Sequence, residues 1–174
     1  MIKLANSAVL ILELLRERQG PQVFGSWFQD AVAAALDGMP RFAGCYDNRG
    51  AGQPDIKAGD TGFEVKSIAG NAIELDVNYR EIRRQFGSFR LVALRTDVRP
   101  YHLWVIEMPM DPPARVTLAP RMDARTPIDQ ALETELAASL SAMIAAAGTA
   151  WAEAADRRRS GEALKVARAS WPSK

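Results

Sequence analysis

Apolar residues recur at helical intervals in the first part of the chain and predict two helices there. The first run lies between residues 4 and 15 and is stopped by Gly20-Pro21. The second run covers residues 24–36 and ends before Gly38. We therefore expect a break between two amphipathic helices, followed by a glycine-rich strand-and-loop region over residues 41–54.

The period of the pattern changes from helical to alternating between Gln53 and Ser67, which indicates a β-hairpin. Three apolar residues share one face and three charged residues the other: Ile56, Phe63 and Val65 against Asp55, Glu64 and Lys66. Gly59-Asp60 separates the two runs and is a glycine-first pair typical of a two-residue type II′ loop. With this loop, Asp55 falls directly opposite Glu64.

Further along the chain, strand patterns surround one basic helical pattern. Strands are expected near residues 72–77, 90–95 and 102–107, and the helix over 78–86. After a proline-rich connection, an alanine-rich helical extension covers about residues 121–170. Within it, Thr126 is the expected N-cap with Pro127 at the first helical position, and Gly148 is expected to separate two helices.

The composition fits one globular domain over residues 1–174. Hydrophobic residues make up 48% and charged residues 25%, which is typical of an ordinary folded protein. The formal net charge is only +1, so a charged partner would have to be bound by a local patch. The apolar stretch at residues 8–12 is too short to span a bilayer, and we expect a cytoplasmic protein without a membrane partner.

Single residues of cysteine and histidine exclude several kinds of site. Cys45 alone cannot form an internal disulfide, a multi-cysteine zinc site or a cysteine-ligated iron-sulfur cluster. His102 alone excludes a histidine-rich zinc site, and its position in an apolar run favours a structural role. No small-molecule cofactor is indicated.

The charged face of the predicted hairpin is the strongest candidate for chemistry. Directly opposed side chains have Cβ atoms about 4.5 to 5.5 Å apart, and like charges there are destabilising. A hard divalent cation between Asp55 and Glu64 would offset this repulsion, since Mg²⁺ takes oxygen ligands and commonly uses one or two carboxylates. Lys66 projects from the same face, where its ammonium can contact a water or an attacked phosphate.

Pro54-Asp55 followed by Glu64-Val65-Lys66 resembles the PD-(D/E)xK motif of the restriction-endonuclease-like nuclease superfamily. The resemblance covers about residues 21–107 and implies an α/β fold with a mixed central sheet flanked by helices. Its core order would be helix, three strands, helix, strand, with the helical extension outside it. The short length and the Glu-Val-Lys-Ser run are most similar to small type II restriction endonucleases.

The resemblance also implies roles for individual residues and a cofactor. Asp55 and Glu64 would bind Mg²⁺, with Mn²⁺ as a substitute, and the backbone carbonyl of Val65 would be a third ligand. Lys66 would position or activate water. Many members add an acid from the preceding helix where this chain has Gln29, which would act on a metal-bound water instead. These are the expected catalytic residues.

The basic helix supplies a candidate surface for DNA. Arg80, Arg83 and Arg84 recur at helical spacing and would line one face near the scissile phosphate. Double-stranded DNA is thus the expected partner. The alanine-rich C-terminal region suits a subunit interface, so a homodimer that cuts both strands is expected by analogy with the family.

Several interpretations of the same residues remain open. Asp55, Glu64 and Lys66 would also fit an ordinary exposed cross-strand charge cluster. Among nucleases, a Mg²⁺-dependent type II restriction endonuclease competes with a Holliday-junction resolvase and with a repair or defence nuclease. Outside that class, the chain could be a nucleic-acid-binding or assembly module without catalytic activity. Arg157-Arg158-Arg159 is interpreted as a solvated helix face.

Overall fold

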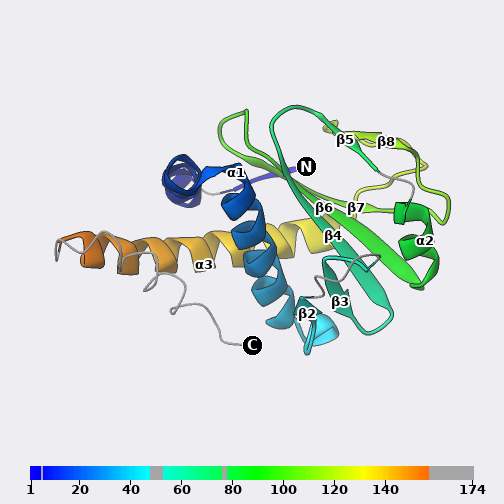
Figure 1. Ribbon diagram of the computed structural model, residues 1–174, viewed down its shortest axis with the longest axis horizontal. Coiled ribbons are helices and arrows are strands. Elements are labelled where there is room, and N and C mark those ends of the chain that lie inside the picture. The colour runs from blue at the N-terminus through cyan, green and yellow to red at the C-terminus, as the bar shows by residue number, and fades with distance from the viewer. Residues whose placement is uncertain (5, 48–52, 76–77, 157–174) are drawn as a thin grey trace.

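A six-stranded mixed sheet forms the centre of the computed structural model, which describes residues 1–4, 6–47, 53–75 and 78–156 (Figure 1). From one edge to the other, its strands are β1 (Ile2–Lys3), β7 (His102–Glu107), β6 (Ser88–Arg95), β4 (Thr61–Ile68), β3 (Ile56–Ala58) and β2 (Tyr46–Asp47). β4 and β6 are parallel, and the other neighbours are antiparallel. The expected α/β class with a mixed central sheet is confirmed.

Helices and a small second sheet cover the two faces of this sheet. α1 (Asn6–Asp37) and α3 (Gln130–Asp156) pack on one face, with the short 3₁₀ helix η1 (Pro40–Phe42) after α1. α2 (Asn78–Arg84) and the antiparallel pair β5 (Ala72–Glu74) and β8 (Arg115–Thr117) pack on the other. Across the ranges that the structure describes, no helix carries an apolar stretch long enough to cross a membrane.

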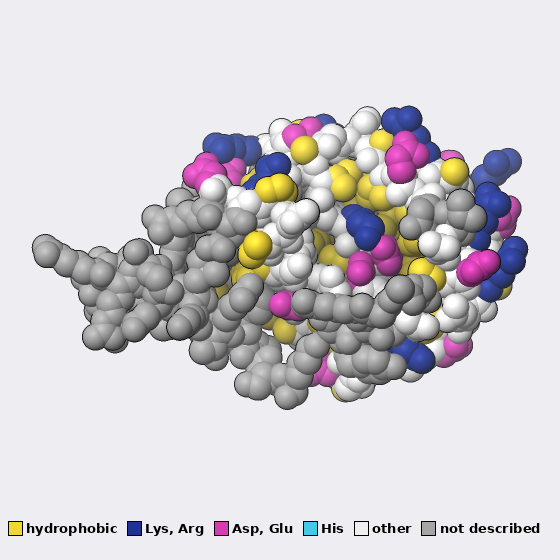
Figure 2. Space-filling view, viewed as in Figure 1, with side chains coloured by type: hydrophobic (Ala, Val, Ile, Leu, Met, Phe, Trp, Pro, Cys, Tyr) yellow, Lys and Arg dark blue, Asp and Glu magenta, His cyan; other side chains and the backbone are white. Residues whose placement is uncertain are grey.

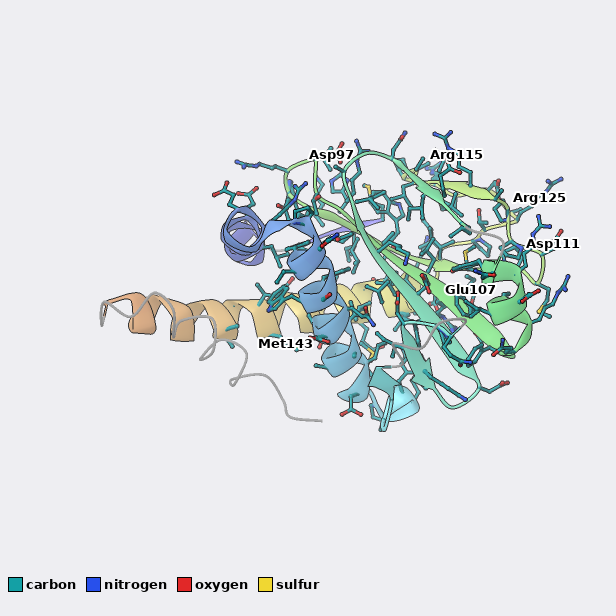
Figure 3. All side chains as sticks on the ribbon, in the orientation of Figure 1. Asp97, Glu107, Asp111, Arg115, Arg125 and Met143 are labelled. Carbon is teal, nitrogen blue, oxygen red and sulfur yellow. The ribbon has the colours of Figure 1, made fainter. Side chains whose placement is uncertain are left out.

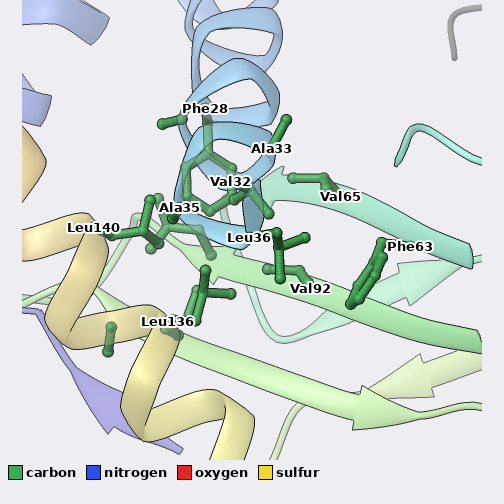
Figure 4. Packing of buried hydrophobic residues seen from close by; sticks show 14 of the residues in the cluster. Phe28, Val32, Ala33, Ala35, Leu36, Phe63, Val65, Val92, Leu136 and Leu140 are labelled. Atoms are coloured by element: carbon green, nitrogen blue, oxygen red, sulfur yellow. The ribbon is translucent and has the colours of Figure 1, made fainter. Parts of the chain in front are cut away.

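The strands divide their side chains between two hydrophobic clusters, as period-two alternation requires. Phe63 and Val65 of β4 lie in the cluster beneath α1 and α3, with Val92 of β6 (Figure 4). Leu91 and Ala93 of β6 lie in the cluster beneath α2, β5 and β8. Glu64 and Lys66 alternate with Phe63 and Val65, so they project from the α2 face of the sheet.

The predicted break between the N-terminal helices is confirmed at Gly20. Its backbone has φ of +77°, a left-handed conformation that side chains with a Cβ rarely adopt, and Pro21 follows it. After the break, Phe28, Val32 and Leu36 are fully buried against the sheet. The helical stripe predicted for residues 24–36 therefore forms the main contact of α1 with the core.

The hairpin register is the one predicted from the alternating pattern. Ala58 pairs with Thr61 and Ile56 with Phe63, so Gly59 and Asp60 form the loop. Gly59 has φ of +58°, which favours glycine at this position. The predicted strands near residues 90–95 and 102–107 are confirmed. The strand predicted for residues 72–77 is shorter: it forms β5, which ends at Glu74.

Two predictions about the C-terminal helix were wrong. The helix starts at Gln130, where Asp129, not Thr126, is the N-cap and accepts the Leu132 N–H at 3.1 Å. Residues 127–129 instead extend the sheet, because the Glu107 N–H donates to the Pro127 carbonyl and the Asp129 N–H to the Val105 carbonyl. α3 also continues through Gly148 without a break. Residues 157–170 of the predicted extension, with the three-arginine run, lie outside the described residues.

Asp129 joins the start of α3 to the sheet, since its other carboxylate oxygen accepts Arg90 Nε at 2.9 Å. We expect Asp129→Ala to lower the free energy of unfolding by about 1 to 3 kcal/mol, because a cap and a half-buried ion pair are both lost. Asp129→Asn keeps a good cap and should cost less. Urea unfolding of both variants checks this, and equal losses would contradict the capping role.

Candidate functional site

The β3–β4 ladder stops at Pro54, and this places the Asp55 carboxylate against the neighbouring strand. Proline has no N–H to donate, so the next pair of backbone hydrogen bonds cannot form, and β3 begins at Ile56. The Val65 N–H donates instead to Asp55 Oδ2 at 2.8 Å. Because the N–H and C=O of a strand residue point to the same side, the Val65 carbonyl also points to the side of β4 where Asp55 lies.

The structure brings the three charged residues of the hairpin together. Lys66 Nζ lies 2.5 Å from Glu64 Oε1 and 3.8 Å from Asp55 Oδ2. The Glu64 side chain is 12% exposed, that of Asp55 25% and that of Lys66 40%. The group, here called the acid-lysine trio, is therefore half-buried and has one more negative than positive charge.

The trio is partly exposed to solvent, most of all at Lys66. Figure 2 shows dark-blue and magenta side chains side by side in the middle of the visible face, over β4, with apolar surface around them. A charge pair surrounded by apolar groups is screened less by water than one on an open charged surface. A ligand with compensating charge would therefore interact strongly at this position.

Gln29, the predicted auxiliary residue, reaches the hairpin from α1. Its Nε2 donates to the backbone carbonyl of Asp55 at 3.2 Å. The helix therefore holds the main chain of Asp55 in place where the ladder has ended. This contact is with the backbone of Asp55, so it supports a positioning role for Gln29.

Tyr79 on α2 also belongs to the site, although it is not among the residues selected from the sequence. Its ring packs edge-on against Phe89 of β6, with centroids 5.3 Å apart. Burial raises the pKa of the Tyr79 hydroxyl well above its usual value, and the negative charges of Glu64 and Asp55 raise it further. Tyr79 thus stays protonated beside the two acids and can donate a hydrogen bond.

The three arginines of α2 do not share one exposed face, which corrects one predicted DNA contact. Arg83 is buried, and it donates from Nε to the Met108 carbonyl and from its terminal nitrogen to the Phe86 carbonyl, at 2.9 and 2.7 Å. Its guanidinium fastens the end of α2 to the chain after β7 and cannot contact DNA. Arg80 and Arg84 are exposed, and Arg80 Nε lies 3.4 Å from Asp111 Oδ1.

The remaining candidate residues stand apart from the trio. Cys45 is buried, and its thiol donates to the Ala33 carbonyl at 3.2 Å. His102 lies on β7, which β6 separates from β4. Burial lowers the pKa of the His102 imidazole, and nearby Lys3 and Arg95 lower it further. These surroundings favour the neutral imidazole and a structural role.

The donors at the trio suit a hard cation held partly by water. Within the described part of the chain, no three or more histidine, cysteine, aspartate or glutamate side chains converge to hold a metal ion. Asp55 and Glu64 offer two carboxylates, and the Val65 carbonyl faces the same place. Mg²⁺ commonly takes only one or two carboxylates and completes its octahedron with water and phosphate, so this oxygen set fits it.

No protein-family model, curated protein or solved structure matches this chain. The interpretation of the site therefore depends on its residues and their geometry.

The raised pKa of Tyr79 predicts a specific pH dependence of stability. Above pH 10 the unfolded chain loses this proton while the folded chain keeps it, so stability should fall as pH rises. The slope from this one group is about 1.4 kcal/mol per pH unit. Tyr79→Phe should remove that part of the decline, which urea unfolding between pH 9 and about 11 measures; an unchanged slope would contradict the assignment.

Proposed function

We propose that the protein is a divalent-cation-dependent endodeoxyribonuclease that hydrolyses phosphodiester bonds at the acid-lysine trio. One observation carries this proposal: Asp55 and Glu64 converge on Lys66 Nζ where Pro54 ends the strand pairing. Two carboxylates and an amine on adjoining strands, with a carbonyl facing the same place, supply oxygen donors for a cation and a positive group for a phosphate.

The order of the elements supports the same assignment. α1, β2, β3, β4, β5, α2 and β6 follow one another along the chain. Because β5 belongs to the separate two-stranded sheet, the remaining elements have the order helix, three strands, helix and strand of the nuclease superfamily that the motif resembles. The crossover from β4 through β5 and α2 to β6 joins two parallel neighbouring strands, with Glu64 on β4 and Asp55 directly before β3. The proposed restriction-endonuclease-like core consists of these elements.

The cation would be held by Asp55, Glu64 and the Val65 carbonyl. When bound, Mg²⁺ lowers the pKa of a coordinated water and polarises a phosphoryl oxygen. Gln29 keeps the Asp55 backbone in position through its carbonyl. Tyr79, held protonated, can donate a hydrogen bond to an oxygen near the acids.

In the proposed reaction, a water oxygen forms a bond to phosphorus and the bond from phosphorus to the leaving sugar oxygen breaks. The water gives up a proton and the leaving oxygen gains one, so that a phosphomonoester and a free hydroxyl result. Lys66 can donate hydrogen bonds to the phosphate oxygens, on which negative charge increases during attack. Its position beside both acids suits this electrostatic role.

An ordinary surface ion-pair cluster is the main alternative. Exposed ion pairs contribute little, with typical values of about 0 to 1 kcal/mol. The side chains of Glu64 and Asp55 are only 12% and 25% exposed, however, and the trio itself carries one excess negative charge. That excess favours a site built to take up a further cation.

The type of DNA that is cut distinguishes the kinds of nuclease. We propose double-stranded DNA as the substrate and a homodimer as the active form, with α3 as its interface. A type II restriction endonuclease would give discrete fragments from a plasmid, whereas a non-specific defence or repair nuclease would give a smear. A resolvase would leave a linear duplex intact and cut a branched one.

The test is cleavage of supercoiled plasmid and of a four-way junction with Mg²⁺. The wild type should cut one of them, whereas Asp55→Asn, Glu64→Gln and Lys66→Ala should each lose at least about 100-fold in rate, as expected when a group that stabilises the transition state is removed. Matched controls are Glu107→Gln and Lys3→Ala, which change the same residue types on β7 and β1.

The controls should retain wild-type rates, and circular dichroism should show that all variants are folded. Full activity of Asp55→Asn or Glu64→Gln would contradict the catalytic assignment. No cleavage of either DNA by the wild type, with Mg²⁺ or Mn²⁺, would favour the binding-module alternative.

A further inference from the structure

A polar cavity lies beyond α2, and none of the trio residues lines it. Its volume is about 520 Å³, and its walls come mainly from β8 and the segments on either side of it, with Arg80 from α2. Figure 3 labels Asp111, Arg115 and Arg125 around this end of the molecule. The volume lies in the range of pockets that take small ligands or parts of larger ones, about 300 to 1,000 Å³.

The cavity has an excess of positive charge. Four arginines and two aspartates line it: Arg80, Arg115, Arg121, Arg125, Asp111 and Asp123. Four guanidinium groups around one cavity repel one another, and the two acids neutralise only part of their charge. An anion with several oxygens would offset the remainder.

Both aspartates are already engaged in local contacts. Asp111 lies 3.4 Å from Arg80 Nε. Asp123 accepts the backbone N–H groups of Arg125 and Thr126 and the Thr126 hydroxyl, all within 3.1 Å. These hydrogen bonds lower the pKa of the Asp123 carboxyl, so it stays ionised and occupied by the loop.

The arginines of the cavity differ in whether they form ion pairs with carboxylates. Arg115 forms an ion pair of 3.4 Å with Glu74, but both side chains are more than 60% exposed, so the pair contributes little. Arg121 and Arg125 are exposed, and among the described residues their guanidinium groups have no carboxylate partner. The guanidinium groups of these two arginines are therefore available at the wall of the cavity to donate paired hydrogen bonds to phosphate oxygens.

We propose that this cavity binds a backbone phosphate of the nucleic acid whose scissile phosphate lies at the acid-lysine trio, and this inference rests on the proposed function. α2 provides the connection. Tyr79 packs against Phe89 of β6, the strand that pairs with β4, and the next residue, Arg80, lines the cavity. Successive residues of one short helix thus lie next to the sheet of the trio and in the wall of the cavity, so one strand of nucleic acid could reach both.

The experiment measures the salt dependence of binding to a labelled linear duplex and a labelled four-way junction, with Ca²⁺ in place of Mg²⁺ to prevent cleavage. The test variant is Arg121→Gln/Arg125→Gln. The control is Lys3→Gln/Arg99→Gln, which removes the same charge from exposed residues that do not line the cavity. The logarithm of the binding constant falls linearly with the logarithm of the salt concentration. Each lost phosphate contact should make this line shallower by about 0.9.

On the DNA that the wild type binds, we expect the slope to become shallower by about 0.9 in the test variant and to stay unchanged in the control. An unchanged slope in the test variant, or no binding of either DNA by the wild type, would overturn the inference. A free mononucleotide has the same phosphate chemistry. If it binds the wild type but not the test variant, while the slope for DNA is unchanged, a small phosphorylated ligand occupies the cavity and the inference also fails.

The outcomes separate this inference from the proposed function. A reduced slope without cleavage of any DNA by the wild type would support the phosphate pocket and contradict the nuclease. Mg²⁺-dependent cleavage that requires Asp55, together with an unchanged slope, would support the nuclease and overturn the pocket.

Discussion

The arrangement of the site depends on one electrostatic constraint: two carboxylates on adjoining strands converge on a single amine. The hairpin register enforces this convergence, because the buried Ile56–Phe63 pair fixes which residues face each other. A slip of β4 by one residue would turn Glu64 and Lys66 into the core and Phe63 and Val65 away from it. The hydrophobic effect thus helps to keep two carboxylates close together despite their mutual repulsion.

The parts of the structure that follow from local pattern could be predicted from the sequence. The alternation around Gly59-Asp60 determines the hairpin, and helical spacing with Gly20-Pro21 determines the broken helix at the N-terminus. The convergence of Asp55, Glu64 and Lys66 follows from the same alternation. Each of these features depends on residues close together in the chain.

The errors concern contacts between distant segments. Thr126 has the sequence features of an N-cap, but backbone hydrogen bonds from β7 keep residues 127–129 extended. Helical spacing places Arg83 with Arg80 and Arg84, yet only the folded chain brings the Met108 carbonyl to its guanidinium. Tyr79 gives no local signal, because its link to the acids depends on how α2 packs on the sheet.

α2 is the element that connects the proposals, although it is only two turns long. Tyr79 packs against Phe89 of the sheet, Arg83 fastens the helix to the core, and Arg80 lines the cavity beyond α2. The burial of Arg83 with two carbonyl partners keeps the other two residues in a fixed relation. A rigid helix between a cation site and an arginine cavity would hold a polyanion at two points.

Anomalous diffraction from crystals soaked in Mn²⁺ would show whether the trio holds a divalent cation. We expect one anomalous peak bounded by the carboxylates of Asp55 and Glu64 and the carbonyl of Val65, and no such peak in Asp55→Asn crystals. A map without a peak there at saturating Mn²⁺, with Lys66 still between the two acids when duplex is bound, would contradict the cation site.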